Sequence, residues 1–351
     1  MTSNYVGNLV RDSRTTEQWL ARRPAEKALE PDLPIIDAHH HLWDHREKGI
    51  RYLFEDFQAD LHAGHRIVST VFVEASSMYR ASGPEHLRPV GEVEFARGMA
   101  AMAASGIYGE TRVAEAIVGC ADMSRGAAVQ EVLEAEIEAA GGRMRGIRHY
   151  TVYDEGQVGR HIAKRSPPHM LGDPTFREGI ARLNRLGLTF DAWVFYTQLD
   201  DVRQLAAAFP EMPIVLDHVG TLLGVAEHAE KGPAARAQWQ RGLKELSAME
   251  NVFIKIGGMG MPMFGYGFHE EALPPNSEAL AKAWAPTVET CIEFFGPARC
   301  MFESNFPVDR QSCGYAELWN AFKRITRSFG PDERRSLFSG TAARFYRIEA
   351  P

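Results

Sequence analysis

The segment IIDAHHHLWD, residues 35–44, leads from a short apolar run directly into three consecutive histidines. Side chains alternate across a strand, so Asp37, His39 and His41 are predicted to share one face while His40 faces the other way. Two imidazoles on one face, at the end of a strand, can reach a single metal ion or a single substrate oxygen. We therefore interpret His39 and His41 as functional, and His40 as a structural residue packed between the strand and a layer of helices.

Seven further runs of apolar or β-branched residues have the length of strands, and amphipathic helical segments separate them. Three of those segments, 129–140, 176–186 and 238–249, carry apolar residues at i, i+3 and i+4. Alternation of strands and helices implies a parallel sheet, and eight strands are the number that closes a barrel. An open doubly wound sheet is the alternative, but the chain has no GxGxxG fingerprint, so we predict an α/β fold of the (β/α)8 TIM barrel type. The predicted strands are 35–42, 67–74, 116–121, 144–150, 189–195, 213–218, 252–257 and 300–304.

The length of the chain fits one large domain with long loops. A barrel of this kind needs roughly 250 residues, and the chain has 351. We predict an N-terminal extension over residues 1–33 and the barrel over residues 34–351. Long loops follow the second, fourth and seventh strands, at 76–92, 152–171 and 257–277, and such loops shape the catalytic face of a barrel. The last is rich in Gly, Met and Phe, and it is either a mobile apolar lid or an insertion packed on the rim.

Composition excludes several classes of function. The formal charge of −7, from 39 Lys plus Arg against 46 Asp plus Glu, gives no broad attraction to nucleic acid. Four cysteines without CxxC spacing indicate buried free thiols rather than a disulfide framework. No secretory signal begins the sequence, and no apolar run approaches the ~18 residues of a membrane span. We expect a cytoplasmic protein with a small-molecule substrate, and leave a homo-oligomer open.

Three motifs occur in order along the chain: His39-His40-His41, Asp217-His218-Val219-Gly220, and the segment FESNFPVD over residues 302–309. Together they resemble the amidohydrolase superfamily, in particular the branch that contains sugar-lactone and 2-pyrone-4,6-dicarboxylate lactonases. The resemblance spans roughly residues 34–348. It implies a barrel whose active site lies at the C-terminal ends of the strands, and a carboxylated or polyhydroxylated lactone as substrate.

The resemblance also implies roles for individual histidines. His218, at the end of the sixth strand, would be a third active-site imidazole facing His39 and His41, and Asp217 would orient a neighbour. The three imidazoles are candidate ligands of one divalent metal ion, Zn or Mn. Because this branch includes enzymes that work without a metal, a metal-free mechanism stays open.

Four other side chains at strand ends are candidates for binding substrate. Arg148 and Tyr150 share one face of the fourth strand, and a guanidinium suits a carboxylate or a developing oxyanion. Trp193 is either an apolar wall of the pocket or a core residue. Glu74 is either a metal ligand or partner of a catalytic histidine, or it forms a salt bridge with Arg148. Lys255, inside an apolar strand, is expected in a buried structural ion pair rather than a Schiff base.

The eighth strand departs from the family pattern. Relatives commonly have Gly-Ser-Asp there, whereas this chain has Glu303-Ser304-Asn305. Asparagine cannot act as a general base at neutral pH and binds cations weakly. Glu303, pointing inward one layer deeper, Asp309, in the loop at the mouth, or Glu74 would then be the base.

We therefore predict a hydrolase that opens a lactone, or a cyclic amide, by attack of water on the carbonyl carbon. A metal-dependent non-oxidative decarboxylase of an aromatic or unsaturated acid is the first alternative, and Asn305 argues against it. A non-catalytic small-molecule binder is the second alternative.

Overall fold

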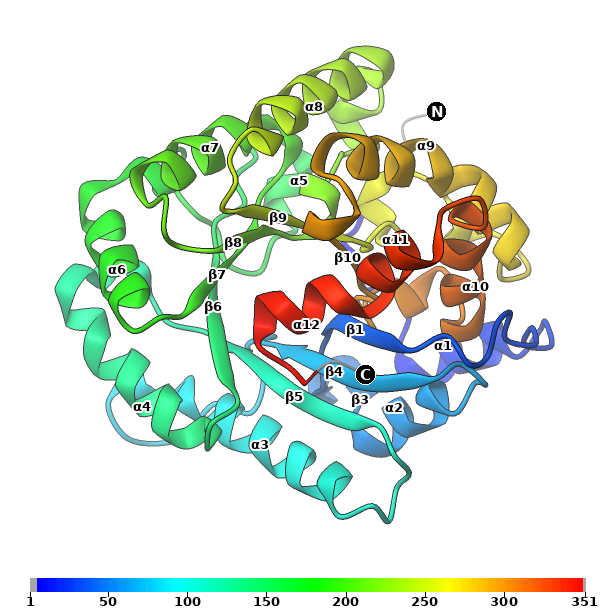
Figure 1. Ribbon diagram of the computed structural model, residues 1–351, viewed down its shortest axis with the longest axis horizontal. Helices are drawn as coiled ribbons and strands as arrows, with labels where there is room; N and C mark the ends of the chain where they lie inside the picture. The colour runs from blue at the N-terminus through cyan, green and yellow to red at the C-terminus, as the bar shows by residue number, and fades with distance from the viewer. Residues whose placement is uncertain (1–4, 350–351) are drawn as a thin grey trace.

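Eight parallel strands form one sheet in chain order in the computed structural model, which describes residues 5–349 (Figure 1). The sheet closes where the segment after β10 meets β1, because the Asn305 amide donates to the His39 carbonyl at 2.9 Å and the His41 amide to the Phe306 carbonyl at 2.8 Å. The predicted (β/α)8 barrel and all eight strand positions are confirmed. The strands are β1 (Ile35–His40), β4 (Ile67–Val73), β5 (Arg112–Gly119), β6 (Met144–Tyr150), β7 (Thr189–Trp193), β8 (Ile214–Leu216), β9 (Val252–Ile256) and β10 (Cys300–Phe302).

Helices surround the barrel, and the three predicted helical segments correspond to α4, α6 and α8. The strands are buried on both faces, which is why they read in the sequence as continuous apolar runs. The helices are α1 (Ser13–Leu20), α2 (Phe54–Leu61), α3 (Val90–Ala104), α4 (Gln130–Ala140), α5 (Gln157–Arg160), α6 (Pro174–Arg185), α7 (Leu199–Ala208), α8 (Gly232–Ser247), α9 (Ser277–Phe295), α10 (Tyr315–Ile325), α11 (Pro331–Arg335) and α12 (Thr341–Tyr346).

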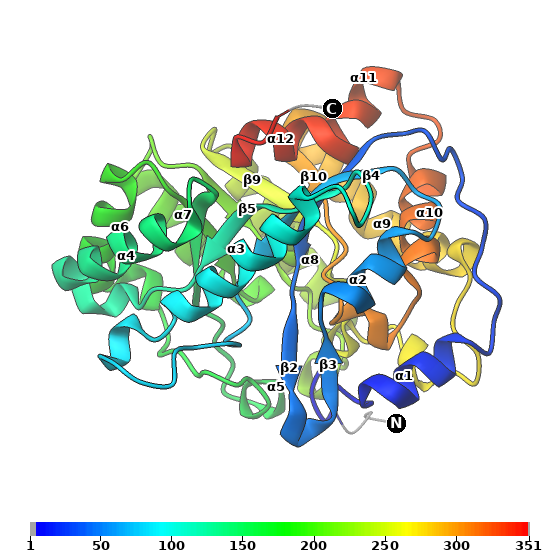
Figure 2. The same cartoon turned by 90° about the horizontal axis from the view of Figure 1, so that it is seen from below.

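The two ends of the barrel are closed by different parts of the chain. The C-terminal helix α12 lies across one opening (Figure 1), where Phe345 and Tyr346 join an apolar cluster with Ile36 and Met301 from the barrel interior. The other end is the barrel mouth, defined here as the end at the C-terminal ends of the strands. The N-terminal segment and a hairpin of β2 (Trp43–His45) and β3 (Ile50–Tyr52) lie there (Figure 2).

One prediction about the first strand is wrong. The pairing of β1 with β4 shifts in register between Asp37 and His40. Ala38 lies in the interior cluster, so Asp37 points outward, where its Oδ2 accepts a hydrogen bond from the Tyr315 hydroxyl at 3.0 Å. The irregularity turns His39 inward directly after Ala38. Strict alternation therefore fails for Asp37, which does not share a face with His39.

His40 has the structural role predicted for it. Its Nε2 lies 2.9 Å from the Thr70 hydroxyl, and its ring stacks on Phe57 with ring centroids 4.3 Å apart. Because α2 carries Phe57, His40 packs between the barrel wall and the helix layer.

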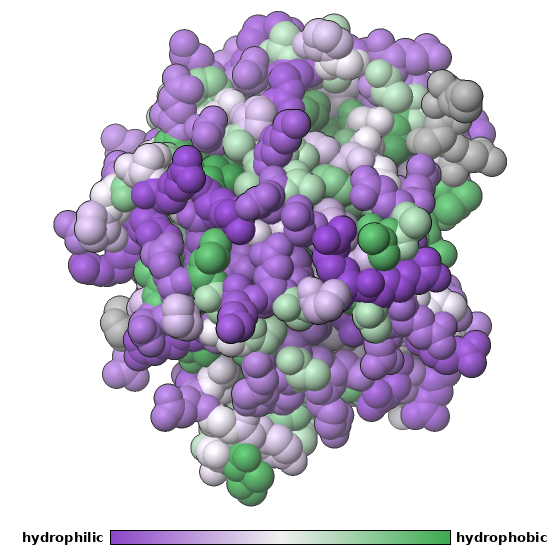
Figure 3. Space-filling model, turned by 90° about the vertical axis from the view of Figure 1, so that its right-hand side faces the viewer, coloured by the Kyte–Doolittle hydropathy of each residue, from purple (hydrophilic) through white to green (hydrophobic). Residues whose placement is uncertain are grey.

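The long loop after β9 is an insertion packed on the rim. Met259, Met261 and Met263 are almost fully buried and belong to the main hydrophobic core. All four cysteines are free, as predicted. Among residues 5–349, no helix has both the length and the apolar character needed to cross a membrane. Hydrophilic residues predominate on the face seen in Figure 3, with apolar residues in small separate areas.

Candidate active site

A cavity of about 710 Å³ opens at the barrel mouth. Six of the residues proposed from the sequence contribute to its wall: His41, Arg148, Tyr150, Trp193, His218 and Asn305. The wall also contains residues that sequence reasoning missed, among them Trp43 from the β2–β3 hairpin and the segment 6–12 of the N-terminal extension. The remaining candidates, His39, Glu303, Glu74 and Asp309, lie beneath or beside this wall, in contact with the residues that form it.

The three predicted imidazoles converge. The Nε2 atoms of His39 and His41 are 3.2 Å apart, and the ring centroids of His39 and His218 are 4.7 Å apart. The three side chains come from two distant strand ends, since β1 carries His39 and the turn after β8 carries His218. His218 has a positive φ of 51°, an uncommon conformation for a residue with a side chain, and such strain is typical of functional sites.

Partners at Nδ1 determine which nitrogen of each imidazole is free. The Nδ1 of His41 lies 2.8 Å from the Val73 carbonyl, which can only accept, so this nitrogen carries the proton and donates. The Nδ1 of His218 lies 2.7 Å from Oε1 of Glu303 and donates to the carboxylate. In the neutral form, both side chains therefore have an unprotonated Nε2. Burial, then the charge of Arg148, hold the pKa of His41 well below its usual range, so it is neutral at pH 7.

The Nδ1 atom of His39 has both a hydrogen-bond acceptor and a hydrogen-bond donor beside it. Its Nδ1 lies 3.1 Å from Oε2 of Glu303 and 3.1 Å from the Lys255 ammonium. It can donate to the first or accept from the second, so both neutral tautomers have a partner. Burial, then the positive charge of Lys255, hold the pKa of His39 well below its usual range.

Glu303 is the carboxylate that joins the histidines. It is fully buried, points inward as predicted, and contacts the Nδ1 atoms of both His39 and His218. Burial would raise the pKa of Glu303, but the two imidazoles outweigh burial and lower it to about 2. Glu303 is therefore ionised throughout the pH range in which enzymes are assayed.

The predicted buried ion pair of Lys255 is confirmed. Its ammonium lies 2.7 Å from Oδ2 of Asp191 and 3.1 Å from Oδ1 of Asp217, and all three side chains are fully buried. Asp191 also accepts a hydrogen bond from the Tyr346 hydroxyl at 2.6 Å. Asp217 was expected to orient a neighbour, and its Oδ1 lies 3.7 Å from Nδ1 of His39. The lysine thus balances two carboxylates directly beneath the histidines.

Arg148 and Glu74 form the salt bridge that was one of two interpretations of Glu74. The Arg148 Nε donates to Oε1 of Glu74 at 2.8 Å, and its NH2 group donates to the Glu74 backbone carbonyl. Its NH1 group lies 3.3 Å from Nε2 of His39. The Glu74 side chain is fully buried and is not among the described residues that line the cavity. It holds the guanidinium in place beside the imidazoles.

Two aromatic rings stand above this guanidinium. Tyr150 and Trp193 pack edge to face with centroids 5.4 Å apart, and the Arg148 guanidinium carbon is 5.8 Å from the centroid of each ring. Both rings line the cavity. They shield the guanidinium from water on one side, which strengthens its attraction to an anionic group.

Asn305 lines the cavity at the position where relatives commonly have Asp. It has a φ of 53°, and its Nδ2 donates to Oδ1 of Asp309 at 2.8 Å. Asp309 follows β10 in the loop at the mouth, as expected, but its side chain is fully buried and its Oδ2 accepts from the Gly260 amide at 2.7 Å. Burial raises the pKa of Asp309 well above its usual range. Asp309 fixes the orientation of the Asn305 amide and does not meet the cavity.

Two groups of side chains among the described residues are spaced closely enough to hold a metal ion. The first is His39, His218 and Glu303, whose ligand atoms lie within 4.8 Å of one another. Those atoms already contact each other at 2.7 and 3.1 Å, which are hydrogen-bond distances. The second is Asp154, Glu227 and His228, from the loops that follow β6 and β8.

The wall residues that the sequence did not predict follow no simple pattern. Trp43 stacks on His41 with centroids 5.5 Å apart and an interplanar angle of 15°. In the sequence, the one indication that Trp43 belongs to the site was its position two residues after His41. The N-terminal segment 6–12 has no periodicity that would place it at the mouth.

Comparison with known proteins identifies the family. Residues 36–348 match the Amidohydrolase family, Amidohydro_2. An uncharacterised protein, y4mH, from Sinorhizobium fredii is 31% identical over 337 residues, covering 90% of this chain and 99% of its own length. An L-fucono-1,5-lactonase from Burkholderia multivorans is 28% identical over 325 residues, covering 90% of this chain and 97% of its own length.

Solved structures agree on the architecture. An amidohydrolase from Burkholderia multivorans with bound zinc has a TM-score of 0.67 at 25% identity, covering 90% of this chain and 99% of that one. A putative 2-pyrone-4,6-dicarboxylic acid hydrolase from Pseudomonas putida has a TM-score of 0.60 at 17% identity, covering 91% and 99%. At that identity the second likeness shows the fold alone. Because the family match extends over nearly the whole barrel, the chain belongs to the amidohydrolase family and is a hydrolase of the amidohydrolase type.

Proposed function

We propose that the chain opens a lactone ring by hydrolysis, with His218 and Glu303 as the proton-transfer pair. The relative from Burkholderia multivorans that is named L-fucono-1,5-lactonase supports this reaction class. The observation that carries the proposal is the contact of 2.7 Å between Nδ1 of His218 and the buried, ionised carboxylate of Glu303. His218 lines the cavity with Glu303 behind it, and the pair needs no aspartate at position 305.

The first chemical step uses the free Nε2 of His218. It accepts a proton from a water molecule as the water oxygen attacks the lactone carbonyl carbon. The Glu303 carboxylate stabilises the imidazolium that forms and keeps the imidazole in the tautomer with a free Nε2. Glu303 itself does not reach the cavity, so it acts through His218. The sequence left Glu303, Asp309 and Glu74 open as the general base in place of an aspartate at position 305. In this proposal the general base is His218.

Arg148 supplies positive charge beside the histidines. Glu74 takes its Nε, which leaves NH1 beside His39 for the oxyanion that develops on the carbonyl oxygen. When the ring C–O bond breaks, the His218 imidazolium returns the proton to the alkoxide. The product is a hydroxy acid.

The residues also fit one divalent metal ion. His39 and His41 bring two Nε2 atoms to 3.2 Å, a separation compatible with nitrogen ligands at about 2.0–2.1 Å from one ion. When His39 donates from Nδ1 to Glu303, the Nε2 lone pairs of His39 and His41 face each other and would both be available to one cation. A bound ion, zinc as in the structural neighbour or manganese, would polarise the carbonyl oxygen. His218 is assigned to proton transfer, because one Nε2 cannot both coordinate and accept a proton.

The test combines elemental analysis of purified protein with a lactone panel followed by a pH indicator. Acid release from lactones is expected for the wild type, and none above background for His39→Ala and His218→Ala. His169→Ala is the matched control, because His169 is exposed and its Nδ1 contacts Asp201 at 3.0 Å, outside the residues that line the cavity. It is expected to keep full activity. Circular dichroism of all three variants checks that the barrel is intact.

Each other outcome has a defined meaning. Full activity in His39→Ala or His218→Ala contradicts the proposed site. Carbon dioxide release from carboxylated aromatic acids, with no lactone opened, would replace the proposal with a decarboxylase. Binding of ligands without any turnover would make the chain a small-molecule binder. Full activity of a metal-free preparation would show that the reaction needs no metal ion, and the proposed hydrolysis would stand without it.

A further inference from the structure

Part of the cavity wall comes from outside the family barrel. Every residue from Val6 to Asp12 lines the cavity at the mouth, whereas the family match begins at residue 36. Two relatives match over 97% and 99% of their own lengths but cover only 90% of this chain. The segment 5–12, called the N-terminal strap below, is therefore an addition to the family barrel at the place where substrate enters.

The strap is held to loops from opposite sides of the mouth. At its beginning, the Tyr5 carbonyl accepts from the Gln157 side chain at 3.1 Å, after β6. In its middle, Oδ1 of Asn8 accepts from the Met263 amide at 3.3 Å, in the loop after β9. Between these contacts the strap crosses the mouth, as a bound segment rather than a loose end.

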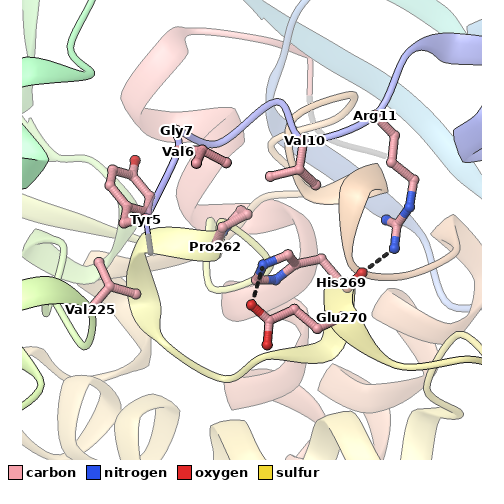
Figure 4. Close-up of a pocket in the computed structure, with 9 residues that line it drawn as sticks. All are labelled: Tyr5, Val6, Gly7, Val10, Arg11, Val225, Pro262, His269 and Glu270. Atoms are coloured by element: carbon pink, nitrogen blue, oxygen red, sulfur yellow. Dashed lines mark hydrogen bonds and ion pairs between the residues drawn. The ribbon is translucent and has the colours of Figure 1, made fainter. Parts of the chain in front are cut away.

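Arg11 anchors the other end of the strap. Its guanidinium donates to the His269 carbonyl (Figure 4). It also donates to the Gln311 carbonyl at 3.0 Å, and its guanidinium carbon lies 4.4 Å from the ring centroid of Trp19 in α1. On this side the strap also covers a second cavity of about 280 Å³ with Tyr5, Val10 and Arg11 in its wall. Arg11 therefore uses its charge to hold the strap.

The strap brings three apolar side chains, Val6, Leu9 and Val10, to the main cavity. Leu9 packs against the apolar cluster that contains Trp43, Ile50 and Met261, all of which also line the cavity. The charge of Asp12 is already used, because Oδ1 of Asp12 accepts from the Thr15 amide at 2.7 Å and caps α1. The cavity thus combines apolar side chains of the strap and the hairpin, which also contributes His45 and Lys48, with the imidazoles and the guanidinium at the strand ends.

We infer that the N-terminal strap determines substrate specificity, and that the substrate is a lactone whose ring carries an apolar alkyl or aryl substituent. This inference rests on the proposed lactone hydrolysis. The ester group lies against His218 and Arg148, and the substituent lies against Leu9 and Val10. Burial of apolar surface there raises kcat/KM for a substituted ring over a bare ring.

The experiment compares a bare ring, δ-valerolactone, with an alkyl-substituted ring, δ-dodecalactone. It uses the full chain, a variant lacking residues 1–10, and the double variant Leu9→Ser/Val10→Ser, which keeps the strap if the deletion fails to fold. The full chain is expected to prefer the alkyl lactone at least about tenfold in kcat/KM. Both variants are expected to lose about tenfold or more of that preference, mainly through KM. Glu17→Ala, an exposed position of α1 away from the cavity, is the matched control and should keep the preference.

A second readout separates failure of the strap from failure of the reaction. Trp43 and Trp193 line the cavity, so quenching of tryptophan fluorescence by 5-hydroxydodecanoate reports binding without turnover. Equal use of both lactones, unchanged in the variants, overturns the role of the strap and leaves lactone hydrolysis standing. Binding of the alkyl acid that weakens in the variants, without hydrolysis of any lactone, supports the strap and overturns the reaction. If the protein neither hydrolyses any lactone nor binds the alkyl acid, both the role of the strap and the proposed reaction are overturned.

Discussion

Replacing Glu303 with glutamine tests the proton-transfer pair directly. The two oxygens of Glu303 contact two imidazoles, His218 at 2.7 Å and His39 at 3.1 Å. Glutamine is nearly isosteric, but it has one oxygen and one NH2 group. Its oxygen can accept from only one imidazole, and its NH2 group then meets the N–H of the other. One histidine must change its tautomer or lose its partner.

The size of the effect follows from the lost charge. A hydrogen bond to a charged group contributes about 1.5–3 kcal/mol, and each 1.36 kcal/mol in a barrier is a factor of ten in rate. A loss of about 2–3 kcal/mol lowers kcat roughly 30- to 150-fold. Burial would raise the pKa of Glu303, but the two imidazoles outweigh burial and lower it to about 2, so the acid limb of the rate profile does not report this carboxylate.

The assay is the pH profile of kcat and kcat/KM on the best lactone of the panel, with Glu317→Gln as the matched control. Glu317 is also buried, but it accepts from the Glu26 amide at 2.7 Å and lies on α10. The control should keep wild-type kcat and an unchanged profile. A kcat for Glu303→Gln within about threefold of wild type would refute the reasoning.

Two further variants test the buried charges around the site. Lys255→Met leaves Asp191 and Asp217 without their cation, so the free energy of unfolding in urea should fall by about 3–5 kcal/mol; a loss below about 1 kcal/mol would show that the lysine does not balance them. Burial and the Glu74 carboxylate raise the pKa of Glu92 from 4.5 to about 8, so between these values the folded state binds more protons than the unfolded state, and stability falls as pH rises. Glu92→Gln should flatten the decline of Tm between pH 5 and 8, and parallel declines in variant and wild type would contradict the assignment.

The barrel was predictable because its strands carry a strong signal. Each strand is buried on both faces, so each appears as a short apolar run between turn residues. The short hairpin of β2 and β3 was not predicted, because WDHREKGIRY has neither an apolar run nor clear alternation. Asp37 was placed on the wrong face, because a register shift within the strand leaves no mark in the residue pattern.

The site was predictable as a set of residues but not as a set of contacts. His39, His41, His218 and Arg148 could be placed at strand ends, where a barrel brings them together. The sequence could not show which histidines Glu303 contacts, because the distance between side chains of β8 and β10 depends on the closure of the barrel. For the same reason the contact of Lys255 with His39 at 3.1 Å was missed. The strap escaped prediction because its position depends on hydrogen bonds to loops far along the chain.

The helix that closes the base of the barrel has a consequence for how the protein is handled. Tyr346 in α12 bonds Asp191, Asp191 pairs with Lys255, and Lys255 contacts His39. Trimming the C-terminus back past Tyr346, or a tag that lifts α12 away, would let water reach Asp191 from below and loosen the hold on the ammonium. A preparation damaged there would lose turnover with every residue of its substrate cavity still in place, so the integrity of the last helix belongs among the first checks on an inactive sample.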